Sequence, residues 1–423
     1  MRIVIIAAGS RGDVQPYVAL GEGLKDAGHE VRLVTNINYE ALVNAHGLAF
    51  WPVDVNTQDL AEGDRMRALL ESGNLLAQMA ELAKMAKESA IKVAARGLEA
   101  CQDADMVIGG LSGMFVAAAI SERTGIPMIQ AHNVPFTPTQ AFPGALIPSL
   151  PRWLGRAPNR LAHHLTRQIM WQTVRPSDRI IRRQVFHLPS SPFWGPFRSG
   201  ILQQSPILYG LSPAVIAPPT DWDPAQIHVT GFWFLEPAET WCPSPALVRF
   251  LEMGPPPVYV GFGSMSNRNP EDTANLVLKA LEQKGYRGIV FSGWGGLQKA
   301  DLPDTVLMVD STPHTWLFPR MAAVVHHGGA GTTAAGLRAG VPSIVVPFHG
   351  DQPFWGRRVA ELGVGPSPIR RSKLTAKKLA QALEIAENDQ AMRRRAADLG
   401  AKIRAEDGVA NAVALIERRH GLG

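Results

Sequence analysis

The stretch Val324-Val325-His326-His327-Gly328-Gly329-Ala330-Gly331-Thr332-Thr333 decides the fold, and it is followed by Gly340-Val341-Pro342 and then by Asp351-Gln352. It predicts a buried strand, a glycine-rich turn, a helix start and a second strand. Glycines let a phosphate approach the backbone, and a helix N-terminus offers it unpaired N–H groups and a partial positive charge. His327 and Thr332 add side-chain donors. The turn therefore predicts a diphosphate site, although a tight strand-to-helix corner is the alternative. The later polar pair predicts a polar group attached to the diphosphate, as in a nucleotide-sugar.

The same alternation of strands and helices runs through the rest of the chain. Strands are expected at residues 3–8, 30–35, 106–110, 127–131, 258–262, 288–291, 306–309, 323–326 and 343–347. Residues 57–100 predict one or two long amphipathic helices, and residues 375–420 predict the closing helices. Prolines crowd residues 206–257, which makes that stretch the best candidate for a linker. The pattern predicts an α/β protein of two Rossmann-like domains with parallel sheets, facing a cleft.

Composition narrows the class of protein. The 423 residues are 46% hydrophobic and carry a net charge of +5, which does not fit a dedicated nucleic-acid binder. Cys101 and Cys242 are too few for a disulfide framework, so a reducing cytoplasm is expected. The opening apolar run is too short for a signal peptide, and we find no apolar run long enough to span a bilayer. We expect a cytoplasmic protein, soluble or peripheral at the inner membrane surface.

Several motifs resemble one enzyme family. The pattern His327-x-Gly-x-Gly-Thr, with Gly340-Val341-Pro342, Pro347 and Asp351-Gln352, resembles the donor signature of family 1 glycosyltransferases of the GT-B fold. The loop Gly9-Ser10-Arg11-Gly12-Asp13-Val14-Gln15-Pro16 resembles the first loop of the sterol 3-β-glucosyltransferase branch and of bacterial antibiotic-glycosylating relatives. Ser292-Gly293-Trp294-Gly295-Gly296-Leu297 and Pro353-Phe354-Trp355-Gly356 resemble the sterol branch in particular. The resemblance is weak between about residues 57 and 205, the region that shapes the acceptor pocket in this family.

The resemblance implies an acceptor-binding domain at residues 1–235 and a nucleotide-sugar-binding domain at 236–423, whose terminal helices cross back to the first domain. His327 would hold the diphosphate, as would the backbone of Gly329, Ala330, Gly331 and Thr332, and Ser264 would touch the same phosphates. Asp351 and Gln352 match the pair that hydrogen-bonds the donor sugar. Trp294 and His314 fall near the nucleotide base, and Ser10 and Gly12 are also expected at the donor.

Two features limit this transfer of roles. Core packing is an equal alternative for Trp294 and for Trp316 in the loop of His314. Many members of the family carry a glutamate for the ribose hydroxyls where this chain has Ala335. The sterol branch also lacks it, so the choice between uridine and thymidine stays open.

Asp13 is the first candidate for the catalytic base. Transfer to a hydroxyl needs a base that takes the acceptor proton, and plant members of the family place a histidine three residues before the loop proline, as Asp13 precedes Pro16. An ordinary aspartate is a weak base, so its surroundings would have to raise its pKa. The alternative is that Asp13 caps the first helix. His132, just after a strand end, is a second candidate, as base or as orienting partner.

The acceptor side is less well marked. Phe136 and Phe142 would suit an apolar acceptor, although such aromatics are as easily core. The segment from Arg152 to Arg183 holds eight arginines against one acid, Asp178, which suits peripheral contact with an anionic membrane, the alternative being a solvated basic helix. Asp103 and Asp105 form a pair of the kind that can hold a divalent ion, but they lie far in sequence from the phosphate turn, and a solvated loop is the better interpretation.

These observations together predict an inverting, metal-independent glycosyltransferase. It would move a hexose, glucose from UDP-glucose in the first instance, to a hydroxyl of an apolar acceptor such as a sterol, lipid, polyketide or phenolic. The nucleotide-sugar is a co-substrate, and no further cofactor is expected. Two alternatives stay open: a nucleotide-sugar epimerase of the same fold, and a non-catalytic accessory protein that binds a nucleotide-sugar or lipid.

Overall fold

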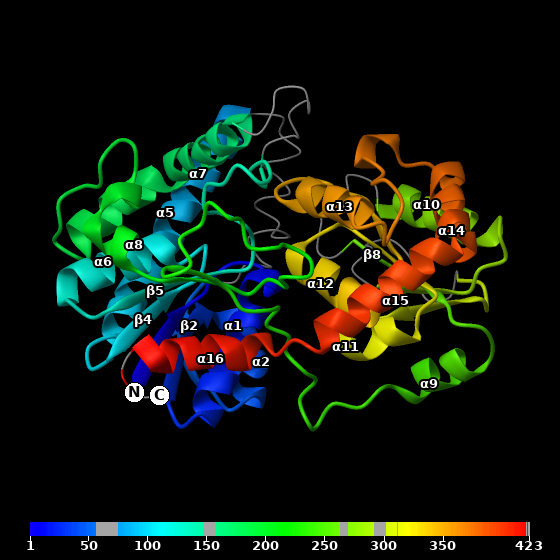
Figure 1. Ribbon diagram of the computed structural model, residues 1–423, viewed down its shortest axis with the longest axis horizontal. Helices are drawn as coiled ribbons and strands as arrows, with labels where there is room; N and C mark the ends of the chain where they lie inside the picture. Colours follow the sequence, from blue (N-terminus) through cyan, green and yellow to red (C-terminus); the bar gives the residue numbers. More distant parts are fainter. Residues whose placement is uncertain are drawn as a thin grey trace. The chain divides into compact units, whose positions relative to one another are not determined.

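The computed structural model describes residues 1–55, 75–146, 157–262, 270–291, 302–310, 312–419 and 421, with the backbone alone for 75–86 and 270 (Figure 1). Ser264, Trp294 and the first part of the helical region expected at 57–100 lie outside these residues. The chain forms two compact units, the first of Met1–Pro213, Ala217–Leu235 and Asp407–Gly423, the second of Ala214–Ile216 and Glu236–Glu406. Both units are α/β with parallel sheets, as predicted.

The first unit contains a parallel sheet with the strand order β3-β2-β1-β4-β5-β6-β7. Its strands are β1 Arg2–Ile6, β2 Glu30–Asn36, β3 Ala49–Val53, β4 Met106–Gly109, β5 Met128–His132, β6 Ile207–Tyr209 and β7 Ile227–Val229. Its helices include α1 Arg11–Asp26, α2 Glu40–Ala45, α5 Leu75–Ala100, α6 Met114–Thr124, α7 Ala157–Gln184, α8 Gly200–Gln204 and α16 Gly408–Arg419.

Helices cover both faces of this sheet, which explains why β1 is apolar from Ile3 to Ile6. Ile3 and Ile5 pack into a core with α1, α2 and α16. Val4 and Ile6 point to the opposite face and pack with α5, α6 and α7. The strand therefore holds two cores together, and the loop at its carboxyl end has a rigid base.

The proline-rich stretch at 206–257 is more regular than the linker prediction allows. It contains β6 and β7, which pair in parallel with each other, and β6 also pairs with β5. Strands of three residues are short enough to fit between the prolines. The strand β7 lies at the edge of the sheet and therefore pairs on one side only. The unit boundary between Leu235 and Glu236 lies inside the same stretch.

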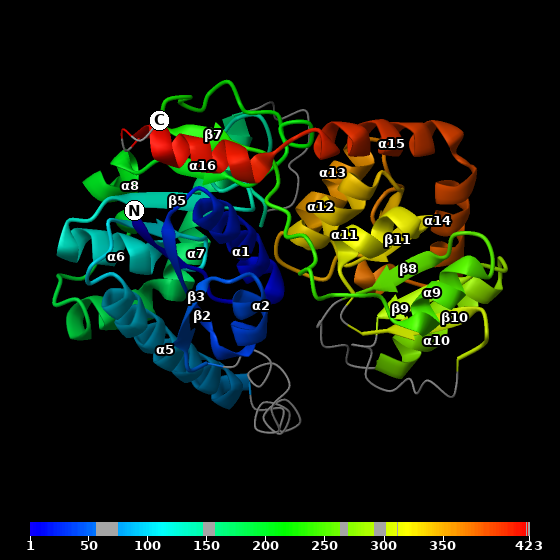
Figure 2. The ribbon, with the colours of Figure 1, turned by 90° about the horizontal axis from the view of Figure 1, so that it is seen from below.

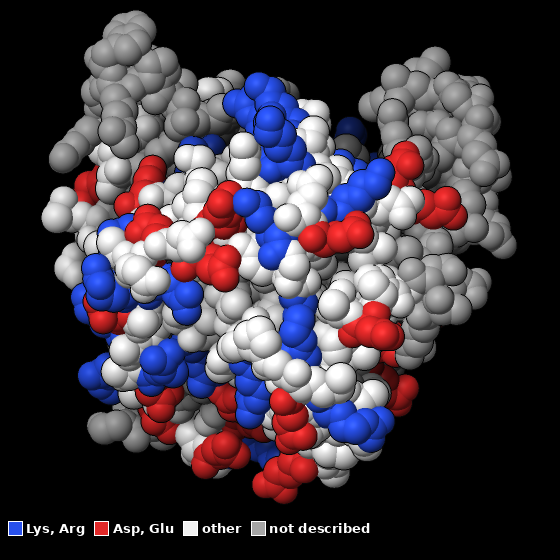
Figure 3. All heavy atoms as spheres, turned by 90° about the vertical axis from the view of Figure 1, so that its right-hand side faces the viewer, with Lys and Arg blue, Asp and Glu red and all other residues white. Residues whose placement is uncertain are grey.

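The second unit contains a parallel sheet with the order β10-β9-β8-β11-β12. Its strands are β8 Val258–Gly261, β9 Gly288–Phe291, β10 Val306–Val309, β11 Ala323–His326 and β12 Ser343–Val345. Its helices include α9 Pro245–Glu252, α10 Pro270–Glu282, α11 His314–Leu317, α12 Ala330–Ala339, α13 Gln352–Glu361, α14 Ala376–Asn388 and α15 Gln390–Arg404. On the face of this unit drawn in Figure 3, basic and acidic side chains are interspersed, as on an ordinary solvated surface.

Helix α16 belongs to the first unit, whereas the expected domain limits assign its residues to the second domain. The sequence predicts one domain at residues 236–423 with helices that cross back, and α16 packs in the first unit (Figure 2). Ala412, Val413 and Ile416 enter the core beside α1. Asn411 Nδ2 donates to the carbonyl of Thr230 at 2.9 Å. The second compact unit therefore ends at Glu406. Within the described residues, no helix has the length and apolar character to cross a membrane.

Candidate active site

The candidate site residues of the first unit lie in the loop at the carboxyl end of β1. Ser10 lies at the N-cap of α1, and the Asp13 carboxylate accepts hydrogen bonds from Ser10 N at 2.9 Å and Ser10 Oγ at 2.8 Å. Both bonds use Oδ2. Gly9 has φ +137°, and a Cβ there would lie 2.7 Å from the same oxygen, so only glycine lets the carboxylate lie against the loop. Asp13 therefore does cap the helix, as the alternative interpretation predicted.

The helix cap is compatible with a second role for Asp13 as a base. Burial raises the pKa of its carboxyl above the usual value, and the hydrogen bonds from Ser10 oppose that rise. The carboxylate is thus a stronger base than a free aspartate, which is the change that the catalytic hypothesis requires.

His132 ends β5 and is buried. Its ring packs edge-on against Phe136 at 5.9 Å between centroids and lies 5.7 Å from the ring of Tyr209. Burial, with a contribution from the charge of Arg167, lowers its pKa to about 3, so the ring is neutral. Its buried Nδ1 has no hydrogen-bond partner among the described residues. So low a pKa makes His132 a poor proton acceptor, and an orienting role suits it better.

Three side chains that the sequence analysis missed fix the first loop. Asn133 Nδ2 donates to the carbonyl of Gly12 at 3.1 Å and so joins the end of β5 to the loop after β1. Asn36 Oδ1 accepts from Gly9 N at 3.0 Å, and Tyr39 Oη donates to the Gly9 carbonyl at 3.1 Å. The structure thereby brings the segments of Asp13 and His132 together at one edge of the sheet. In the sequence, the only indication that Asn133 belongs to this region is its position next to His132.

The two phenylalanines predicted to contact the acceptor differ in their surroundings. Phe136 is buried in the core, where the Arg167 guanidinium lies 5.0 Å from its ring centroid. Phe142 is half-buried, and its carbonyl accepts a hydrogen bond from His163 Nε2 at 3.0 Å. Packing therefore accounts for Phe136, and Phe142 is the better candidate for contact with an acceptor.

The candidate site residues of the second unit begin at the glycine turn between β11 and α12. Gly328 has φ +87°, and its N–H donates to His326 Nδ1 at 3.0 Å. Gly329 is the N-cap of α12 and, as glycine, brings no side chain to cap that end. A Cβ on Gly331, in the first turn, would meet no atom within 4 Å. The turn thus presents a helix N-terminus whose N-cap residue leaves the first N–H groups without a side-chain acceptor of its own, beside open space at Gly331, which suits an anion.

His327 is placed beside the same helix end. Its Nε2 lies 2.5 Å from where a Cβ on Gly329 would be, so the ring lies against the backbone of the turn. Burial, with a smaller effect of His349, lowers its pKa to about 4. Its buried Nδ1 lacks a hydrogen-bond partner among the described residues. A neutral ring with an unused nitrogen can donate to a phosphate oxygen.

The polar pair beyond β12 is held by its own loop. Gln352 is buried, and its Oε1 accepts from Phe348 N at 2.8 Å and His349 N at 3.1 Å. Asp351 Oδ2 accepts from Trp355 Nε1 at 2.8 Å. These bonds orient both side chains at the start of α13, and the sugar contacts predicted for them stay predictions.

The expected base-binding residues lie partly in packed surroundings. The ring of His314, on α11, stacks on Phe318 at 4.3 Å, and its Nε2 lies 3.4 Å from Tyr259 Oη. Trp316 packs edge-on against Trp241 at 5.4 Å. Ala335 is buried in the same apolar cluster as Tyr259 and Phe318. The position that carries glutamate in other members is therefore core in this chain.

The carboxylates considered for a metal have other partners. Asp103 pairs with Arg2 at 3.1 Å and also with Arg32, and Asp105 pairs with Arg2 at 3.3 Å. The hydrogen bond from Arg32 is the main cause that lowers the pKa of Asp103 to about 2. Across the described part of the chain, no group of three or more His, Cys, Asp or Glu side chains is arranged to hold a metal ion.

Replacing Gly328 with alanine is expected to destabilise the second unit by about 2 to 4 kcal/mol, because the positive φ is strained for alanine and its Cβ would crowd the core. That Cβ would lie 2.6 Å from Val345 Cγ1 and 3.1 Å from the Gln352 carbonyl. Thermal unfolding measures the loss. Gly331→Ala is the matched control, since it meets open space in a helix and should not lower the melting temperature. Equal melting temperatures of the two variants would contradict this account of the turn.

Family models match parts of both units. Residues 3–143 match the glycosyltransferase family 28 N-terminal domain, and residues 294–416 match the erythromycin biosynthesis protein CIII-like C-terminal domain. Sterol 3-beta-glucosyltransferase UGT80A2 of Arabidopsis thaliana is 37% identical over 424 residues, which are 98% of this chain and 64% of that protein. For UGT80B1 of the same plant the identity is 34% over 437 residues, covering 99% and 68%. The chain thus spans about two thirds of the length of these two relatives.

A solved structure shares the fold. The glycosyltransferase VinC, in complex with DTDP, superposes with a TM-score of 0.66 at 18% identity and covers 100% of both chains. The fold, the glycine turn and the similarity along nearly the whole chain agree, and the chain belongs to the glycosyltransferase family that contains these sterol 3-beta-glucosyltransferases.

Proposed function

We propose that the protein transfers a glucosyl group from UDP-glucose to a hydroxyl of an apolar acceptor, with a sterol as the first candidate. The N-terminus of α12 beside His327 is the observation that carries the proposal, because it suits a diphosphate. The names of the two plant relatives support glucose and a sterol. The DTDP in the VinC complex makes thymidine diphosphate the nucleotide to compare with UDP.

In the proposed reaction, the acceptor oxygen attacks the anomeric carbon as the bond to the diphosphate breaks, which inverts that centre. Asp13 takes the hydroxyl proton, for which its raised pKa suits it. The leaving diphosphate gains negative charge, which the α12 dipole and an N–H of His327 would offset. Asp351 and Gln352 would hold the sugar hydroxyls, and the proposed step uses no metal ion.

The first test is transfer itself. Purified protein is incubated with radiolabelled UDP-glucose or TDP-glucose and a panel of sterols, glycolipid precursors, polyketides and phenolics in detergent micelles, and products are identified by mass spectrometry. We expect a glucosylated sterol with UDP-glucose as the better donor. The β-linkage, read by NMR, checks inversion, and chelation of divalent ions should leave the rate unchanged.

The same assay distinguishes the alternatives. Conversion of the sugar when no acceptor is present would favour an epimerase. Binding of UDP-glucose without turnover on any acceptor would favour the accessory role and overturn the proposal.

A further inference from the structure

Helix α7 presents large apolar side chains to solvent. Leu161, Leu165 and Ile169 are 60, 48 and 55% exposed, and their four-residue spacing places them on one face of the helix. Among the described residues they belong to no core cluster, whereas α7 buries Trp171 and Ile181 on its other side. A row of this kind on an otherwise packed helix indicates a surface that contacts something apolar.

A second apolar feature lies beside this face. Phe193 and Trp194 are 51 and 71% exposed, and their rings pack edge-on at 5.1 Å. The Phe193 carbonyl accepts hydrogen bonds from Trp171 Nε1 at 2.8 Å and Gln172 Nε2 at 2.9 Å, both from α7. The aromatic pair is therefore held outward by the structure.

The exposed charged side chains of α7 are all basic. The helix carries six arginines and one acid, Asp178, which is buried. Arg175, Arg179 and Arg183 continue the face that begins with the leucines, at the same four-residue spacing. The Arg175 guanidinium also lies 4.7 Å from the Phe193 ring centroid. Among the described residues, Arg182 pairs with an acid, Glu122, at 2.8 Å.

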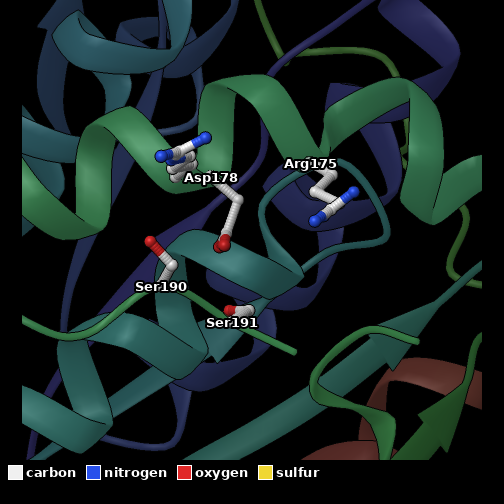
Figure 4. A pocket seen from close by; sticks show the side chains of 5 residues that line it. Arg175, Asp178, Ser190 and Ser191 are labelled. Atoms are coloured by element: carbon white, nitrogen blue, oxygen red, sulfur yellow. The ribbon is translucent and has the colours of Figure 1, made fainter. Parts of the chain in front are cut away.

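The basic half of the face is hollowed. One hollow of about 290 Å³ is lined by Arg175, Asp178, Arg179, Ser190 and Ser191, and another of about 460 Å³ is lined by Gln172, Arg175, Pro176, Arg179 and Ile180. Figure 4 shows Asp178 directed toward Ser190 and Ser191, away from Arg175. The two arginines shared by both hollows are therefore the groups that an incoming anion meets.

We infer that the outward face of α7, together with Phe193 and Trp194, docks on the headgroup layer of an anionic bilayer. Tryptophan and phenylalanine at the surface suit the membrane–water interface, and arginines suit lipid phosphates. Leu161, Leu165 and Ile169 would enter the acyl boundary, and Arg175 and Arg179 would contact phosphates. The inference rests on the proposed function in one respect, since a sterol acceptor resides in such a bilayer.

The test is co-sedimentation of the full chain with phosphatidylcholine vesicles that contain or lack phosphatidylglycerol. We expect binding to the anionic vesicles that falls at high salt. Arg175→Gln with Arg179→Gln should weaken binding roughly tenfold to thirtyfold, and Trp194→Ser should weaken it by about tenfold. The matched controls lie in the second unit, Lys377→Gln with Arg394→Gln for charge and Met253→Ser for an exposed apolar side chain. Equal binding to both kinds of vesicle, or variants that bind like wild type, would overturn the inference.

The transfer assay separates this inference from the proposed function. With the acceptor in detergent micelles, the α7 variants should turn over at the wild-type rate, whereas with a vesicle-embedded acceptor they should be slower. Transfer in micelles without any binding to vesicles would refute the docking surface alone. Binding to anionic vesicles without transfer would refute the proposed function alone.

Discussion

Replacing Asp13 with asparagine is expected to lower kcat by about 10² to 10⁴-fold, because the variant keeps the helix cap and loses the base. The asparagine oxygen can accept the same two hydrogen bonds from Ser10 that Oδ2 accepts. Initial rates at saturating donor and acceptor measure the effect. Asp26→Asn, on the same helix but exposed, should leave the rate unchanged.

The pH dependence of Asp13 gives a second measurement on the same variant. Because burial raises the pKa of this carboxyl in the folded protein, the folded state binds the proton more tightly than the unfolded chain does. Its stabilising effect is therefore present below the unfolded pKa and is lost as the pH rises through the raised pKa. Asp13→Asn should then unfold no more easily than wild type at neutral pH, while wild-type activity falls as the pH drops through the raised pKa. A variant that loses stability but keeps its kcat would reduce Asp13 to a helix cap.

Replacing His327 with alanine is expected to lower kcat/KM for the donor by about 10² to 10³-fold, the usual effect of removing one donor to a developing anion. The neutral ring lies against the start of α12, and its pKa of about 4 keeps it a neutral N–H donor at neutral pH. Rates over a range of UDP-glucose concentrations measure the effect, and the affinity for UDP should fall as well.

His327→Gln serves as the conservative variant, since its amide N–H can reach toward the same space. It should recover part of the lost rate, and both variants should melt within a few degrees of wild type. Full activity of His327→Ala would remove the histidine from the donor site and leave the helix N-terminus alone to hold the phosphates.

The sequence was sufficient to predict the two loops that hold most of the candidate site residues, because each loop follows from a local strand and helix pattern. The apolar run at β1 and the glycine turn before α12 each combine a buried strand with a helix start, so both loops could be placed at the carboxyl ends of strands. The capping of α1 by Asp13 could also be predicted, because it depends on the spacing of Ser10 and Asp13 along the chain. The raised pKa of Asp13 depends on burial, which the spacing does not reveal.

Contacts between distant segments could not be predicted. Asn133 reaches Gly12 because β1 and β5 flank β4 in the sheet, an order that no local pattern reveals. β6 and β7 were missed since strands of three residues are too short for a periodicity. The sequence leaves acceptor contact and core packing equally open for Phe136, and the contacts with Arg167 from α7 and with the ring of His132 favour the core.

The return of α16 to the first unit has a consequence for synthesis. The second unit is nearly contiguous in the chain and is complete at Glu406. In the first unit, Leu20 and Leu24 stay without the Ala412, Val413 and Ile416 side chains of their core until α16 has emerged from the ribosome. Of the two units, the one whose translation starts earlier is thus the one whose folding is completed later.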